Sequence, residues 1–207
     1  MPEKMEERPP TKGEQTRAAV IEAAYELFRE KGYAATSMRQ IAERAELALG
    51  GIYNHFASKE EIFAAVLEAY HPYKKIIPAF EQVEGETVGA FVRDAARRIQ
   101  KEIEGFETKL LPLMLTELVE FQGNHLATLL QSIMPSLLGF VQKFHERKGR
   151  LRAVPTPVML RMLAAMFVGY MLTELVLRNV QTFKEYQFDW FDGMIDIYLH
   201  GILDSEG

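Results

Sequence analysis

The strongest constraint on the fold of this chain is a helical spacing of apolar residues that extends over almost its whole length. Apolar side chains recur three and four residues apart, which places them on one face of a helix. An early run of this kind is Val20, Ala23, Ala24, Leu27 and Phe28. Alternation of apolar and polar residues, the pattern of a half-buried strand, is almost absent. The sequence therefore predicts an all-α protein.

Composition and missing motifs exclude several kinds of function. The chain has no cysteine, which excludes disulfides and thiolate chemistry. Its net charge is -5, so any basic surface for nucleic acid must be local. The sequence contains no H-E-x-x-H pair, no phosphate-binding loop and no serine nucleophile motif. We therefore expect no catalytic residue, no metal site and no cofactor, and we do not expect an enzyme.

The N-terminal part of the chain is predicted to form one longer helix followed by two short ones. The first covers Glu14–Lys31 and ends at Gly32, because glycine accepts the positive φ that often follows a helix. Ser37 and Gln40 have the spacing of a capping box and begin the second helix. The third covers Gly50–His55. Two short helices joined by a tight turn predict a helix-turn-helix, in which the third helix is presented outward.

The rest of the chain is predicted to be a larger helical region. Ser58 and Glu61 form a second capping box, which begins a helix from Lys59 to about Tyr70, and Pro72 ends or kinks it. Further helices are expected over residues 87–104, 109–122, 125–148, 155–180 and 189–203. We expect a flexible tail over residues 1–12, a helix-turn-helix domain over 13–58 and a helical effector-binding and dimerisation domain over 59–207.

Three sequence blocks in the first third of the chain resemble a known family. They are "AAYELFREKGYAATSMRQIAERA", "GGIYNHF" and "SKEE", in this order. Together they resemble the DNA-binding region of the tetracycline-repressor (TetR/AcrR-type) transcriptional regulators. The resemblance implies a cytoplasmic, ligand-responsive repressor that binds a double-stranded DNA operator of pseudo-palindromic sequence. It also implies a homodimer and a divergent helical second part.

The resemblance also implies which residues contact DNA. Residues at the start of the second helix would meet phosphates, and the third helix would meet phosphates or base edges. The glycines would let the backbone approach the duplex closely. The implied DNA-binding residues are Thr36, Ser37, Arg39, Gly50, Gly51, Tyr53, Asn54, His55 and Lys59.

Several positions depart from the family pattern. Glu46 stands where glycine is common in the turn, and a positive φ there would cost about 1 kcal/mol or more. Ala48 replaces the usual Ser or Thr cap of the third helix. Leu49 and Gly51 replace polar residues that would contact phosphate. These departures leave an alternative open, a small-molecule-binding protein of the same fold with weak or no specific DNA binding.

Methionine and aromatic residues beyond the first third of the chain are consistent with an adaptable apolar cavity. The resemblance implies that it holds a small, mostly apolar effector. Glu117 and His125 could orient that effector, because both lie in apolar surroundings, although a salt bridge or a surface histidine remains the alternative. The candidate lining residues are Tyr70, Phe91, Met114, Glu117, Phe121, His125, Met134, Met166 and Tyr170.

The last two predicted helices carry more apolar surface than one small core can cover. The helix over residues 155–180 is apolar nearly all round, but Arg161 and Glu174 interrupt it. A membrane span needs about 20 apolar residues, so we expect no membrane contact and a buried helix of a soluble protein. A subunit interface accounts for the excess apolar surface. The resemblance implies that these two helices pair with their mates in a homodimer.

Overall fold

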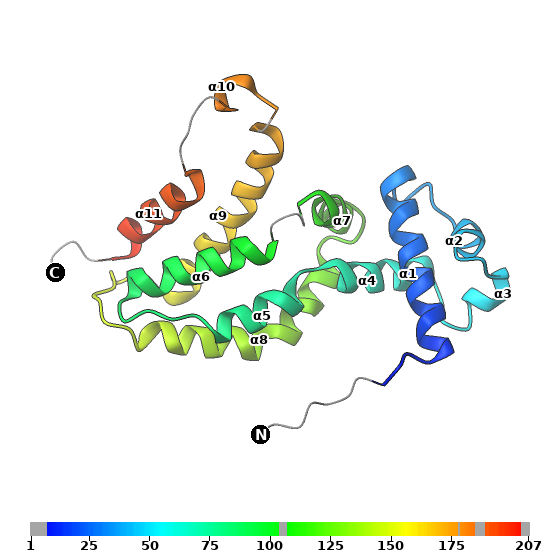
Figure 1. The fold of residues 1–207 in the computed structure, drawn as a ribbon, viewed down its shortest axis with the longest axis horizontal. Coiled ribbons are helices and arrows are strands. Elements are labelled where there is room, and N and C mark those ends of the chain that lie inside the picture. The colour runs from blue at the N-terminus through cyan, green and yellow to red at the C-terminus, as the bar shows by residue number, and fades with distance from the viewer. Residues whose placement is uncertain (1–7, 104–106, 178, 185–188, 204–207) are drawn as a thin grey trace. The chain divides into compact units, whose positions relative to one another are not determined.

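The all-α prediction is confirmed. A computed structural model of the chain describes residues 8–103, 107–177, 179–184 and 189–203, and these ranges contain helices and no strand (Figure 1). The helices are α1 (Lys12–Lys31), α2 (Met38–Arg44), α3 (Leu49–Ile52), α4 (Lys59–Tyr70), α5 (Tyr73–Glu81), α6 (Val88–Ile103), α7 (Glu107–Glu120), α8 (Asn124–His145), α9 (Thr156–Leu177), α10 (Gln181–Lys184) and α11 (Trp190–Ile202).

Two helices were not predicted, and one is shorter than predicted. Helix α5 begins directly after Pro72, which the sequence analysis treated as a break, and it contains Pro78. Pro72 occupies the N-cap of α5, where no backbone N–H is needed. Helix α10 occupies a segment that was predicted to be a loop. The third helix was predicted over Gly50–His55, yet α3 ends at Ile52 and the chain continues as a turn.

The chain divides into two compact units whose boundary differs from the expected break after residue 58. The first unit contains Met1–His71 and Lys109–Leu129, and the second contains Pro72–Thr108 and Leu130–Gly207. Helix α4, the described part of α7 and the first turns of α8 therefore belong with the N-terminal helices. The predicted division into residues 13–58 and 59–207 does not separate these units.

The first unit has its own apolar core, which holds the short helices in place. Helices α2 and α4 pack on α1, and α3 packs on α2 (Figure 1). The core includes Leu27, Ile41 and Ile52, none of which is more than 2% exposed. The ring of Phe121 stacks on that of Phe63 with 4.8 Å between centroids. An α3 of one turn is unstable alone, so its position depends on these contacts.

The second unit has a separate core in which α6 and α9 pack on α11. Phe91 is fully buried, and its ring stacks on Phe140 with 5.1 Å between centroids. The hydroxyl of buried Tyr198 on α11 donates to the carbonyl oxygen of Met159 on α9 at 3.0 Å. Burial raises the pKa of Tyr198 to about 12, so it remains a hydrogen-bond donor at neutral pH.

Helix α9 is not buried within the chain, contrary to the sequence prediction. It is long and apolar enough to cross a membrane by length and composition, but a single such helix is weak support for a membrane protein. Only 6% of its most apolar window is buried. The prediction that α9 is buried within its own chain failed because apolar composition does not reveal which chain covers a helix. It indicates only that the apolar face is covered.

Candidate nucleic-acid interface

The turn between α2 and α3 closes α2 with a Schellman motif. The N–H of Leu47 donates to the carbonyl of Ala42 at 2.8 Å, and the N–H of Glu46 donates to that of Glu43 at 3.1 Å. Glu46 has φ = 57°, which is the left-handed conformation that favours glycine. Glu46 therefore carries the strain that the sequence analysis attached to a positive φ at this position, and the motif fixes the direction in which the chain enters α3.

We expect Glu46→Gly to stabilise the protein by about 1 kcal/mol, because glycine removes the strain of a left-handed non-glycine residue. The matched control is Glu43→Gly, an exposed position inside α2. There glycine should destabilise by about 1 kcal/mol, since the backbone is helical. Urea denaturation midpoints of both variants test the pair. Equal shifts of the same sign would show that the turn is not strained.

Helix α3 and the turn that follows it present an open face. The side chain of Tyr53 is 53% exposed and that of Asn54 is exposed, whereas Ile52 is fully buried. A Cβ added at Gly50 or Gly51 would meet no atom within 4 Å. Ile52 therefore anchors this segment to the core, and the surface around the glycines is free for close approach by a partner.

The segment that follows α3 is a continued turn. The N–H groups of His55 and Phe56 both donate to the carbonyl of Ile52 at 3.0 Å. His55 is half-buried, and the Phe56 ring is buried beneath the guanidinium of Arg17 at 4.7 Å. Ala48, the N-cap of α3, makes no side-chain capping bond, as expected. The sequence analysis missed the position of Arg17, because a cation over a distant ring leaves no local pattern.

The start of α2 has the predicted capping box. The Ser37 hydroxyl accepts from the N–H of Gln40 at 3.3 Å, and the Ser37 N–H donates to the Gln40 side chain at 2.9 Å. Ser37 and Arg39 are both exposed. Thr36 is a correction to the predicted DNA-contacting set, since it is only 2% exposed and its hydroxyl donates to the carbonyl of Gly32 at 2.8 Å. The Thr36 side chain holds the loop after α1 and does not face solvent.

Lys59 also differs from the expectation. Its ammonium donates to the carbonyl oxygens of Tyr33 and Thr36, both at 2.8 Å, and lies 4.2 Å from the centre of the Tyr33 ring. Burial lowers the pKa of Lys59. The lysine links the start of α4 to the loop between α1 and α2. Its ammonium is therefore bonded within the chain and is not extended toward a phosphate, as the resemblance implied.

The capping box predicted for α4 is only partly present. The Ser58 hydroxyl accepts from the N–H of Glu61 at 3.1 Å, as expected. The Glu61 carboxylate, however, accepts from the N–H of Ala57 at 2.7 Å and not from the cap residue itself. The bond still ties the turn after α3 to the first turn of α4.

The candidate effector residues are divided between the two units. Tyr70, Met114, Glu117, Phe121 and His125 belong to the first unit. Tyr70 stacks on Tyr25, and its hydroxyl bonds to the carboxylate of Glu22. The spacing and composition that suggested a lining are also those of a packed helical core.

Glu117 and His125 meet, but as a packed structural pair. Glu117 is fully buried, and its carboxylate accepts from the N–H of His125 at 2.8 Å and that of Leu126 at 3.3 Å. The Nδ1 atom of His125 lies 2.8 Å from the same carboxylate, and the imidazole contacts the Phe121 ring edge-on. The two residues predicted to orient a ligand instead link α7 to the first turn of α8 through these hydrogen bonds.

The remaining candidates lie in the second unit and are also dispersed. Phe91 is fully buried in the core, Met166 and Tyr170 pack against that core, and Met134 is exposed on α8. A groove in this unit lies between α5 and α8 and is lined by none of the predicted residues. Sequence reasoning missed it because α5 was not predicted.

A short helix and its following turn, presented outward from a helix-turn-helix with exposed polar side chains and an open glycine surface, form the architecture of a DNA-binding protein. Residues 20–66 match the family model described as bacterial regulatory proteins, tetR family. The chain belongs to this family.

Relatives agree with this assignment. The chain is 44% identical over 59 residues to the HTH-type transcriptional repressor Rv3405c of Mycobacterium tuberculosis, covering 28% of this chain and 31% of that protein. It is 32% identical over 143 residues to the HTH-type transcriptional regulator TcmR of Streptomyces glaucescens, covering 67% and 58%. These alignments thus span between about a third and somewhat over half of the relatives' length.

A solved structure shows the same fold. NalD of Pseudomonas aeruginosa, the secondary repressor of the MexAB-OprM multidrug efflux pump, superposes with a TM-score of 0.65 at 21% identity. The superposition covers 93% of this chain and 99% of NalD. The similarity therefore extends beyond the N-terminal helices to the helical second part.

Proposed function

We propose that the protein is a DNA-binding transcriptional regulator of the cytoplasm, a ligand-responsive repressor that acts by binding and not by catalysis. The observation that carries this proposal is the exposed surface of Tyr53 and Asn54 beside the open glycines, on a segment anchored by buried Ile52. The names of Rv3405c and NalD, both repressors, support the direction of regulation.

DNA binding places α3 and the following turn in the major groove. Tyr53, Asn54 and His55 contact phosphates or base edges there, and the backbone at the two glycines approaches the duplex closely. The exposed Ser37 and Arg39 at the start of α2 contact phosphates and orient the protein on the duplex.

Dimerisation uses an apolar stripe on α9 together with α11. Residues of the stripe recur at alternating spacings of four and three, which is the pattern of a helix–helix seam. They are Val158, Met162, Ala165, Gly169, Leu172 and Val176, all exposed except the half-buried glycine. Small residues at its centre allow a close crossing, and Ile197 on α11, 74% exposed, adds to the apolar surface.

The dimer presents two recognition segments to a pseudo-palindromic operator. In a two-fold dimer the half-sites lie about one turn of DNA apart, ~34–36 Å, or somewhat more. An effector bound in the second unit changes this spacing and releases the operator. The coupling is reciprocal, so operator DNA weakens effector binding by the same factor.

Arginine variants test this DNA-binding surface. Arg39→Ala removes an exposed cation at the start of α2, and Arg29→Ala removes one in the last turn of α1. We expect Arg39→Ala to weaken binding of promoter DNA and to reduce the slope of log affinity against log salt by about 1, because one phosphate contact is lost. Arg29→Ala should change neither quantity. Fluorescence anisotropy with DNA from the protein's own promoter region measures both, and equal effects of the two variants contradict the surface proposed.

A second candidate function is small-molecule binding without an operator. The uncapped, single-turn α3 favours it, because a recognition helix lacking its N-cap bond is less rigid. Under this alternative the affinity for DNA has a salt slope near zero and no sequence preference. The same anisotropy titration therefore separates the two functions.

A further inference from the structure

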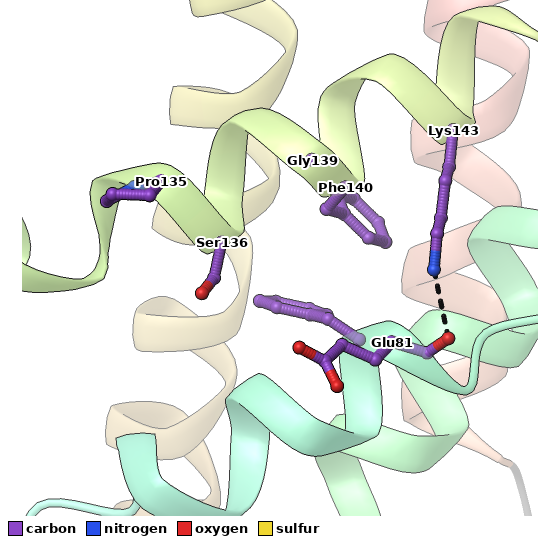
Figure 2. A pocket seen from close by; sticks show the side chains of 7 residues that line it. Glu81, Pro135, Ser136, Gly139, Phe140 and Lys143 are labelled. Atoms are coloured by element: carbon purple, nitrogen blue, oxygen red, sulfur yellow. Dashed lines mark hydrogen bonds between the residues drawn. The ribbon is translucent and has the colours of Figure 1, made fainter.

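The second unit contains a groove between α5 and α8, here called the α5–α8 groove, with a volume of about 580 Å³. This volume is within the usual range for sites that bind small molecules. Its lining residues are Phe80, Glu81, Pro135, Ser136, Gly139, Phe140 and Lys143. Figure 2 shows Ser136, Phe140 and Lys143 extending from α8 toward the helix that carries Glu81.

The sequence of α8 creates the space. Pro135 and Gly139 are one helical turn apart and therefore lie on the same face. Gly139 has no side chain, and a Cβ added there would meet no atom within 4 Å. A larger residue at this position would project into open space, so glycine keeps this side of the groove open.

The floor of the groove is aromatic and firmly held. The Phe80 and Phe140 rings are 4.6 Å apart between centroids, and Phe140 also stacks on fully buried Phe91. Phe80 is half-buried and Phe140 nearly buried, so these rings present a small apolar surface with little freedom to move. A flat aromatic compound is complementary to such a surface.

Polar groups lie at both ends of this floor. Lys143 is a half-buried residue whose ammonium donates one N–H to the carbonyl oxygen of Glu81 at 3.0 Å, and the bond holds it beside the groove (Figure 2). Among the described residues neither its other N–H donors nor the Ser136 hydroxyl has a hydrogen-bond partner. The Glu81 side chain is exposed, so water screens its charge more than that of Lys143. The balance favours an anionic ligand group.

We propose that the α5–α8 groove binds an aromatic organic acid. Its ring lies on the Phe80–Phe140 floor, and its carboxylate accepts from Lys143 and Ser136. If the protein is a ligand-responsive repressor, this acid is its effector. The assignment of an effector role rests on the proposed function. Binding itself does not depend on DNA.

Calorimetric titration of the full-length protein tests the proposal with probes of matched shape, namely naphthoate, naphthylmethanol and naphthylmethylammonium. We expect naphthoate to bind most tightly, by about tenfold over the ammonium compound. Lys143→Met should remove this preference and weaken naphthoate binding by about tenfold, whereas Lys101→Met, an exposed lysine on α6, should change nothing. Gly139→Leu should abolish binding without lowering the melting temperature, because leucine favours a helix more than glycine does.

Three results would overturn the inference: no naphthoate binding by the folded protein, tighter binding of the ammonium compound, or unchanged binding by folded Gly139→Leu. Binding of naphthoate with the expected variant effects supports it even if promoter DNA is not bound, in which case only the regulatory function fails. DNA binding without naphthoate binding rejects the groove and leaves the regulator intact.

Discussion

Replacing Ala165 with glutamate is expected to convert the homodimer into monomers and to weaken operator binding by at least about a hundredfold. Ala165 is exposed at the centre of the α9 stripe, so the change does not disturb the core of one chain. In the dimer the two carboxylates would face each other in an apolar seam, and like charges placed together in an interface cost several kcal/mol. A monomer has one recognition segment and loses the second half-site.

The matched control is Ala164→Glu. Ala164 is also exposed, and it lies about 100° around the helix from Ala165, away from the stripe. It should leave both the dimer and the operator affinity unchanged. Sedimentation velocity measures the mass, and anisotropy measures the affinity. A dimeric Ala165→Glu variant, or equal dissociation by the two variants, would show that the interface lies elsewhere.

Glu117→Ala is expected to destabilise the protein by about 3–5 kcal/mol, because a buried acceptor of several hydrogen bonds disappears. The carboxylate accepts from the N–H groups of His125 and Leu126, the second and third residues of α8, which the helix cannot pair internally. Removing it also leaves the imidazole of His125 without its partner. The loss is a large fraction of the typical ~5–15 kcal/mol stability of a domain.

Two further variants separate capping from a general effect of charge. Glu117→Gln keeps one carbonyl acceptor and should lose only about 1–3 kcal/mol. Glu120→Ala removes an exposed carboxylate from the same helix and should change stability by less than about 0.5 kcal/mol. Urea denaturation of all three variants gives the comparison. A Glu117→Ala variant as stable as Glu120→Ala would refute the structural role of this carboxylate.

Features that depend on neighbouring residues were the ones the sequence predicted well. The capping box of Ser37 and Gln40 is present because its spacing alone sets the geometry. Glu46 was singled out for a similar reason, since it stands where glycine is common in the turn, and its φ is indeed left-handed. The exposed surface at Tyr53 followed from the burial of its neighbours Ile52 and Phe56.

Features that depend on distant residues were not predicted. Thr36 matches a phosphate-contacting position by pattern, yet its hydroxyl is used by the loop after α1. Glu117 was interpreted as a possible ligand contact because it lies in apolar surroundings. Its actual partners lie on the next helix, across a turn that a helical pattern does not describe. The α5–α8 groove needed both Gly139 and a helix that two prolines concealed.

The most direct test of the central claim, that the segment from Leu49 to His55 binds in the major groove, is a footprint on DNA selected by the purified dimer. We predict two protected half-sites related by a pseudo-palindrome, separated centre to centre by about one helical turn or somewhat more. Protection should disappear with Tyr53→Ala at the same salt concentration. A folded dimer that protects no site at low salt, or that protects the same site after Tyr53→Ala, would contradict the account.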